Sequence, residues 1–217
     1  TGLHTADAFR IYVALVTFAF MAWSGSLLRR SDIQLRAGGA LLLVVATSAF
    51  FVSSYRDFGQ REYLALALVF PYLVLTSSRL TECETGRIEA ICIGAFAGIA
   101  VALKPHFLAV PVFVELVGMI YARRLSFCVR PEALTGVTVV ASYIALLTVF
   151  VPDYVFTVVP LCRQVYWGFN QELLPMIESI RYELAGLVLL IYMLARNPRL
   201  SPLLPILIAA ALGFRLA

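Results

Sequence analysis

Long apolar runs recur from one end of the chain to the other, and they constrain the fold more than any other feature of the sequence. Several have about the 17 to 25 residues that a helix needs to cross a bilayer. Charged residues make up only 14% of the 217 residues, against about 25% in a typical soluble domain. The sequence therefore predicts an all-α, polytopic membrane helical bundle, with residues 1–217 forming a single integral membrane domain.

The apolar runs predict about eight membrane segments. Their expected ranges are 8–28, 37–54, 62–78, two short helices within 88–122, 133–151, 176–194 and 203–214. The run 88–122 is longer than one crossing needs, and Lys104-Pro105-His106 interrupts it near its middle, so two helices fit better than one. Within this run, Gly94 and Gly98 have the four-residue spacing that permits close contact between helices. The segment 152–175 is predicted as a long connection whose aromatic residues suit the membrane interface.

The distribution of basic residues predicts an orientation in the membrane. Ten basic residues fall in the odd-numbered connections between the predicted helices, and five fall in the even-numbered ones or, as Arg181, soon after one of them. By the positive-inside rule the odd-numbered connections are cytoplasmic. The even-numbered connections and residues 1–7 are then expected on the outer face of a plasma (inner) membrane. The net charge of +4 follows from this bias and does not suggest a nucleic-acid partner.

Polar side chains from several outer-face segments could form a site there. Carboxylates can act as a general base or hold a divalent cation, which is the one cofactor that these residues suggest. Cationic side chains at the edge of the bilayer suit the phosphate group of a lipid. The candidate catalytic residues are Asp57, Glu62 and Asp7, and the candidate substrate-binding residues are Gln60, Arg61, Lys104, His106 and Arg163. For each residue alone, the alternative is an ordinary polar helix end at the level of the lipid headgroups.

Three further observations limit the possible chemistry. Glu115 lies within a predicted membrane helix, where an unpaired charge is costly, so we expect it to pair with an Arg of a neighbouring helix. The four Cys residues show neither a CxxC nor a Cys/His spacing, so neither a zinc site nor a disulfide framework is indicated. The sequence also contains no P-loop, dinucleotide fingerprint or serine nucleophile elbow.

Two short motifs resemble the membrane region of GT-C type glycosyltransferases, which use polyprenyl-phosphate sugars. One is the segment 58–63, Phe-Gly-Gln-Arg-Glu-Tyr, followed by an apolar helix with Pro71-Tyr72. The other is the helix with Gly94 and Gly98, which ends in Leu103-Lys104-Pro105. The resemblance covers residues 8–121 and implies transfer of a sugar from a lipid-phosphate donor to an acceptor outside the cytoplasm.

The resemblance also raises an expectation about the catalytic acid. In this family that acid generally lies in the first outer loop, after the first membrane helix. We therefore expect the chain to be a fragment of a longer protein, with its main catalytic acid before Thr1 and with Asp7 near that position. In such a fragment, Lys104 and Arg61 would supply the side of the site that binds the donor phosphate.

Two other functions fit the sequence. The interruption at Lys104-Pro105 and the intramembrane Glu115 are typical of a transporter or flippase for a lipid-linked or anionic substrate. A noncatalytic membrane subunit of an enzyme complex is the third possibility. The expected partners are a lipid-linked sugar donor and membrane lipids, whereas the sequence specifies neither the sugar nor a protein partner.

Overall fold

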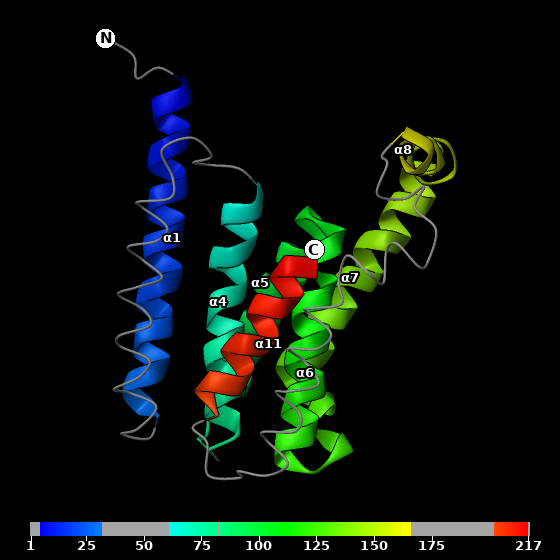
Figure 1. Cartoon of the computed structure of the whole chain (residues 1–217). Coiled ribbons are helices and arrows are strands. Elements are labelled where there is room, and N and C mark those ends of the chain that lie inside the picture. Colours follow the sequence, from blue (N-terminus) through cyan, green and yellow to red (C-terminus); the bar gives the residue numbers. More distant parts are fainter. Residues whose placement is uncertain (1–4, 32–60, 82, 166–201, 217) are drawn as a thin grey trace.

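The computed structural model describes residues 5–31, 61–81, 83–165 and 202–216, and within these ranges the chain is helical and contains no strand. The helices are α1 (Thr5–Arg30), α4 (Arg61–Arg79), α5 (Arg87–Leu103), α6 (Ala109–Ala122), α7 (Pro131–Phe150), α8 (Val159–Val165) and α11 (Leu203–Leu216) (Figure 1). The short 3-10 helices η1 (Pro105–Leu108) and η2 (Leu125–Val129) and the π-helix η3 (Tyr154–Val158) connect them. The predicted all-α class is confirmed for these residues. The predicted helices 37–54 and 176–194 lie outside them.

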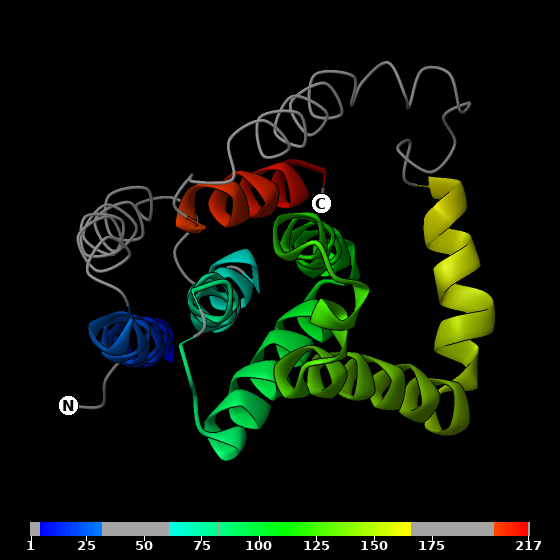
Figure 2. The same ribbon diagram turned by 90° about the horizontal axis from the view of Figure 1, so that it is seen from below.

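Helix α4 forms the centre of the described bundle. It packs against α1, α5, α6 and α11, and Figure 2 shows α4 between α1, α5 and α11 when the bundle is seen along its length. Every residue from Ala67 to Ser78 is buried. A helix that is apolar on all sides is typically enclosed by other helices, which is the position that α4 occupies.

Helices α5 and α6 form the pair that the interruption at Lys104-Pro105 predicts. Helix α5 ends at Leu103, the backbone of Lys104 is extended, and Pro105 begins η1. Because proline cannot donate a backbone hydrogen bond and disfavours helical geometry in the residue before it, the α-helix stops at this position. The prediction of two helices within 88–122 is confirmed.

Glycine residues allow α5 to lie unusually close to α7. A Cβ atom added to Gly94 would overlap the backbone carbonyl of Glu132, and one added to Gly98 would lie 2.7 Å from the Cβ atom of Val139 and 2.8 Å from the carbonyl oxygen of Gly136. These contacts confirm the close helix approach predicted from the spacing of Gly94 and Gly98. They also show that α5 and α7 run in the same direction.

Two predicted boundaries differ from the structure. Helix α7 starts two residues earlier than expected, at Pro131, because proline is well suited to the first turn of a helix. The predicted connection 152–175 is wrong for residues 152–165, which are helical.

Helix α8 is seen end-on in Figure 1 and side-on in Figure 2, so it runs across the direction of α7. Aromatic side chains on this segment, including Tyr154 and Phe156, are exposed.

Two described helical segments, Ala8–Arg30 and Pro131–Phe150, are long and apolar enough to cross a membrane. Tyr63–Arg79 and Ala109–Ala122 are apolar but shorter. Helix α7 has little buried surface and exposes large apolar side chains such as Leu134, Val137 and Val149. These features agree with a membrane location, while the number of about eight crossings stays a prediction.

Candidate functional site

Most of the described arginine side chains lie at one end of the bundle, which we call the basic end. Helices α1 and α4 end there and α5 and α7 begin there. This is shown by the hydrogen bond between the Ser31 and Ser78 hydroxyls at 2.8 Å and by the ion pairs Arg30–Glu89 and Arg79–Glu132. The described basic residues of this end are Arg29, Arg30, Arg79, Arg87, Arg123, Arg124 and Arg130.

Lys104 lies at the opposite end, in the turn between α5 and η1. Helix α5 starts at Arg87 in the basic end, and its 17 residues correspond to a length of about 25 Å at 1.5 Å per residue. The Lys104 side chain is half-buried, and its Nζ atom lies 5.2 Å from the centroid of the Phe107 ring. Leu108 and Val112, which follow on η1 and α6, expose their apolar side chains. A cation therefore lies close in sequence to an exposed apolar surface.

The other predicted site residues are only partly described. Asp7 lies in the first turns of α1, Arg61 and Glu62 begin α4, His106 lies in η1 and Arg163 lies in α8, but the structure does not describe these side chains. Asp57 and Gln60 lie outside the described residues. Figure 1 shows the first turns of α1 and α4, together with α8, toward the same end of the molecule. Whether their side chains meet Lys104 stays a prediction.

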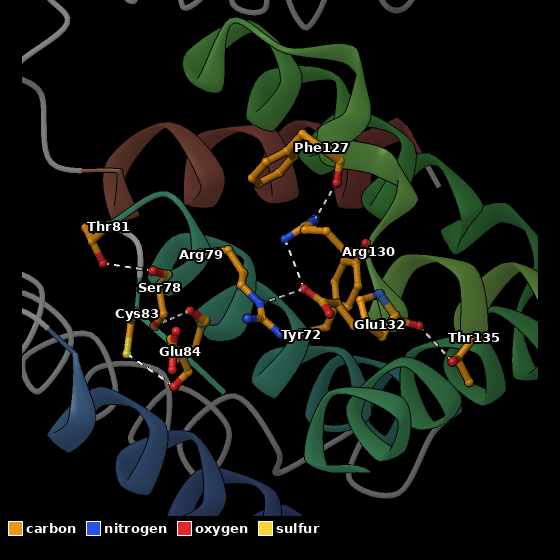
Figure 3. A network of polar contacts seen from close by, with 12 residues as sticks. Tyr72, Ser78, Arg79, Thr81, Cys83, Glu84, Phe127, Arg130, Glu132 and Thr135 are labelled. Atoms are coloured by element: carbon orange, nitrogen blue, oxygen red, sulfur yellow. Dashed lines mark hydrogen bonds and ion pairs between the residues drawn. The ribbon is translucent and has the colours of Figure 1, made fainter. Parts of the chain in front are cut away.

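The most extensive polar network of the described residues is near the basic end and centres on Arg130 (Figure 3). Its Nη2 atom donates to Glu115 Oε1 at 2.5 Å, and its Nη1 atom lies 3.2 Å from Glu132 Oε1. Its Nε atom donates to the carbonyl oxygen of Phe127 at 2.6 Å, and the guanidinium lies 3.7 Å from the centroid of the Phe127 ring. One side chain thus connects α6, η2 and the start of α7.

Helix α4 supplies the facing side of this network. The hydroxyl group of Tyr72 donates to Glu115 Oε1, and Arg79 Nε donates to Glu132 Oε1 at 3.2 Å. Thr76 lies between these two residues on the same face of α4, since helical residues three or four apart are neighbours. The central helix therefore contacts one carboxylate from α6 and one from α7.

Both carboxylates are withdrawn from solvent. The Glu132 side chain is fully buried, and the side chains of Glu115 and Arg130 are 14% and 12% exposed. Two arginines, Arg79 and Arg130, pair with these two glutamates. Among the described residues, Glu115 Oε2, Glu132 Oε2 and the Thr76 hydroxyl have no hydrogen-bond partner.

The network confirms one expectation and shows residues that the sequence did not indicate. Glu115 pairs with an arginine, as expected, and that arginine immediately precedes α7. In the sequence, Arg79 and Arg130 were indistinguishable from other loop arginines. Glu132 could have been noticed because an acidic residue just after a helix-starting proline is favoured by the helix dipole. Its burial follows from the approach of α4 and α5, which a local pattern does not contain.

A second ion pair joins α1 to α5 at the basic end. Arg30 donates through Nη1 to Glu89 Oε2 at 2.8 Å and through Nη2 to Glu89 Oε1 at 3.1 Å. The Trp23 indole donates to Glu89 Oε1 at 3.0 Å, and its ring contacts Phe20 and Phe96. The arrangement fixes the end of α1 against the start of α5.

The described side chains do not suggest a metal site. Within the described part of the chain, no group of three or more His, Cys, Asp or Glu residues is placed to hold a metal ion. Glu115 and Glu132 are near each other but are already balanced by Arg79 and Arg130, which disfavours an added cation. A divalent cation at the predicted outer-face acids stays untested because their side chains are not described.

Comparison with protein-family models, curated proteins and solved structures finds no match to this chain. The resemblance to GT-C type glycosyltransferases therefore stays a prediction.

Proposed function

We propose that this chain is a multi-pass membrane glycosyltransferase that moves a sugar from a polyprenyl-phosphate donor to an acceptor on the extracytoplasmic side. The observation that carries the proposal is the position of Lys104. It is a half-buried cation in the turn between two apolar helices, and it lies at the end of the bundle away from the clustered arginines.

The surroundings of Lys104 suit the two parts of such a donor. An ammonium group stabilises the negative charge that a phosphate leaving group gains during the reaction. The exposed side chains of Leu108 and Val112 offer an apolar surface for the isoprenoid chain. In the proposed reaction, a carboxylate takes the proton of the acceptor hydroxyl, and Asp57, Glu62 and Asp7 are the candidates in this chain.

The proposed orientation follows from the two ends of the bundle. If α1 and α7 cross the membrane, the basic end is on the cytoplasmic side by the positive-inside rule. Lys104 is then on the outer side, where polyprenyl-phosphate sugars are used in the family that the sequence resembles. The exposed apolar face of α7 would contact lipid.

The phosphate-binding part can be tested without knowledge of the sugar, because all such donors share the polyprenyl phosphate. We expect the full chain to bind undecaprenyl phosphate more tightly than undecaprenol, which lacks the phosphate, as measured by native mass spectrometry. Lys104→Ala should remove this preference and Lys104→Arg should keep part of it. Arg87→Ala, which removes an exposed arginine at the basic end, is the matched control.

Transfer itself is tested with membranes that contain the donor lipids and acceptors. Lys104→Ala and Arg61→Ala should each abolish sugar transfer at unchanged expression. Unchanged transfer in both variants would contradict the proposal. Retained phosphate binding without any transfer by the wild type would favour the noncatalytic subunit.

One observation favours a second candidate, a transporter or flippase for a lipid-linked or anionic substrate. Two buried oxygen atoms, Glu115 Oε2 and Glu132 Oε2, have no hydrogen-bond partner among the described residues, and ionisable residues inside a membrane often mark transport pathways. The interruption at Lys104-Pro105 supports it less than the sequence suggests, because it joins two separate helices. Movement of a lipid-linked substrate across vesicles without chemical turnover, lost in Glu115→Gln, would establish this function.

A further inference from the structure

The turn after α6 contains an arginine in a backbone conformation that usually requires glycine. Arg123 has φ 54° and ψ 32°, and it is the one described non-glycine residue with positive φ. The backbone N–H groups of Arg123 and Arg124 donate to the carbonyl oxygens of Ile120 and Met119, each at 3.3 Å. This pair of bonds is the Schellman motif, in which glycine is the preferred residue at the position of Arg123. A side chain with a Cβ atom is strained there.

Strain of this kind is often retained where the side chain is needed. Arg123 and Arg124 are both exposed, and neither side chain has a partner among the described residues. The next residues expose apolar side chains instead, since Leu125 is 81% exposed and Val129 is 60% exposed. Two cations thus lie beside two apolar side chains on the same short connection.

The connection is held rigidly from its inner side. Phe127 is buried, and its ring fills the space where a Cβ atom of Gly118 would otherwise lie. Arg130 stacks on the same ring and donates to the carbonyl oxygen of Phe127. Because Phe127 is fixed against the bundle, Leu125 and Val129 are displayed outward without a large loss of conformational freedom on binding.

We propose that residues 123–129 form a binding site for the headgroup of an anionic phospholipid. Arg123 and Arg124 bind its phosphate, and Leu125 and Val129 enter the boundary between headgroups and acyl chains. The connection leads directly into α7, one of the helices that can cross a membrane, so it lies at the level of the headgroups when α7 does so.

The charge of the surrounding surface matches this ligand. The described, exposed arginines of the basic end without side-chain partners are Arg29, Arg87, Arg123 and Arg124. Against them, Glu84 is the one exposed acidic residue described at that end. A surface with this excess of positive charge attracts the anionic lipids of a cytoplasmic leaflet. The inference uses the membrane location of the chain and is independent of sugar transfer.

The experiment measures the thermal unfolding midpoint of the detergent-solubilised full chain with phosphatidylglycerol or phosphatidylcholine. We expect phosphatidylglycerol to raise the midpoint of the wild type more than phosphatidylcholine does. The double variant Arg123→Ala/Arg124→Ala should lose most of that difference. Leu125→Gln should lower the response to both lipids. Arg87→Ala should lose much less of the response than the double variant does, because it removes one charge of the surrounding surface and leaves residues 123–129 intact.

Three single variants separate binding from backbone strain. Arg123→Gly should raise the midpoint without lipid, because it relieves the strain, and should weaken the response to phosphatidylglycerol. Arg123→Ala should weaken the lipid response without that gain, and Arg123→Lys should keep the response. Equal effects of the two lipids on the wild type would overturn the proposal, as would an Arg87→Ala variant as impaired as the double variant. A dimer that Leu125→Gln dissociates, with no lipid preference, would instead identify a second copy as the occupant.

Discussion

Arg130 shows how a single side chain can hold two acids inside an apolar bundle. Its guanidinium reaches Glu115 on α6 and Glu132 on α7, while Arg79 of α4 provides the second positive charge. Buried charges that are paired in this way add little net stability compared with an apolar core. Removal of one partner, however, leaves a buried charge without compensation. The network therefore specifies which helices meet more than it strengthens their contact.

This balance predicts the effect of Arg130→Met. The variant should lower the free energy of unfolding by about 3–5 kcal/mol, because Glu115 loses its counter-ion and Glu132 keeps only Arg79. The double variant Arg130→Met/Glu115→Gln removes one charge of each sign and should recover part of the loss. Denaturant unfolding in detergent measures both variants. If Arg130→Met loses no more unfolding free energy than the exposed control Arg87→Ala, Arg130 does not compensate the buried charges of the two glutamates.

The pairing of Glu115 could be predicted from sequence, but its partner could not. An acid inside an apolar run is costly unless it is paired, so a nearby arginine is required on physical grounds. Which arginine meets it depends on how η2 brings Arg130 back toward α6. The same limit applies to Lys104, whose place at a helix end was predictable, whereas its approach to the Phe107 ring was not.

At the scale of elements, the crossing of α5 and α7 depends on glycine. The added Cβ atom of a Gly94→Ala variant would overlap the carbonyl of Glu132, so α5 and α7 would have to separate. We expect a loss of about 1–3 kcal/mol, the usual cost of overpacking, despite the better helix propensity of alanine. Thermal or denaturant unfolding measures the change.

Substitution of two other glycines by alanine should cost less stability. An added Cβ atom at Gly136 would lie 3.3 Å from the carbonyl oxygen of Gly94, so Gly136→Ala should cost less than Gly94→Ala. Gly86 has no atom within 4 Å of that position, so Gly86→Ala should change stability least. Equal losses in all three variants would contradict a role of close packing between α5 and α7.

The helices α1, α4, α5, α6, α7 and α11 were predictable because each is a long apolar run bounded by charge, proline or glycine. Residues 152–165 were missed because prolines, aromatic residues and β-branched residues made the segment resemble a connection. Proline is compatible with the first turn of a helix, as at Pro131, and this local preference also shifted the start of α7.

For the whole molecule, the opposition of a basic end and a Lys104 end is the property on which both proposals depend. Contacts between helix ends assemble the basic end, and the lengths of α5 and α7 separate it from the other end. The orientation was predicted by counting the basic residues in the loops, and this count does not require knowledge of how the helices pack. It was therefore accessible from sequence, whereas the arrangement of α1, α5 and α11 around α4 was not.

Labelling of single cysteines tests whether α7 carries the chain across the membrane. Ser126 precedes α7, Thr157 follows it, and both are exposed. The 20 residues of α7 span about 30 Å, which is the thickness of the hydrocarbon core. In a background with the four native cysteines replaced by serine, a membrane-impermeant maleimide should label Thr157→Cys on intact cells. It should label Ser126→Cys only after permeabilisation. Labelling of both positions on intact cells would place both ends of α7 on one side of the membrane. That result would contradict the predicted orientation and both proposed sites.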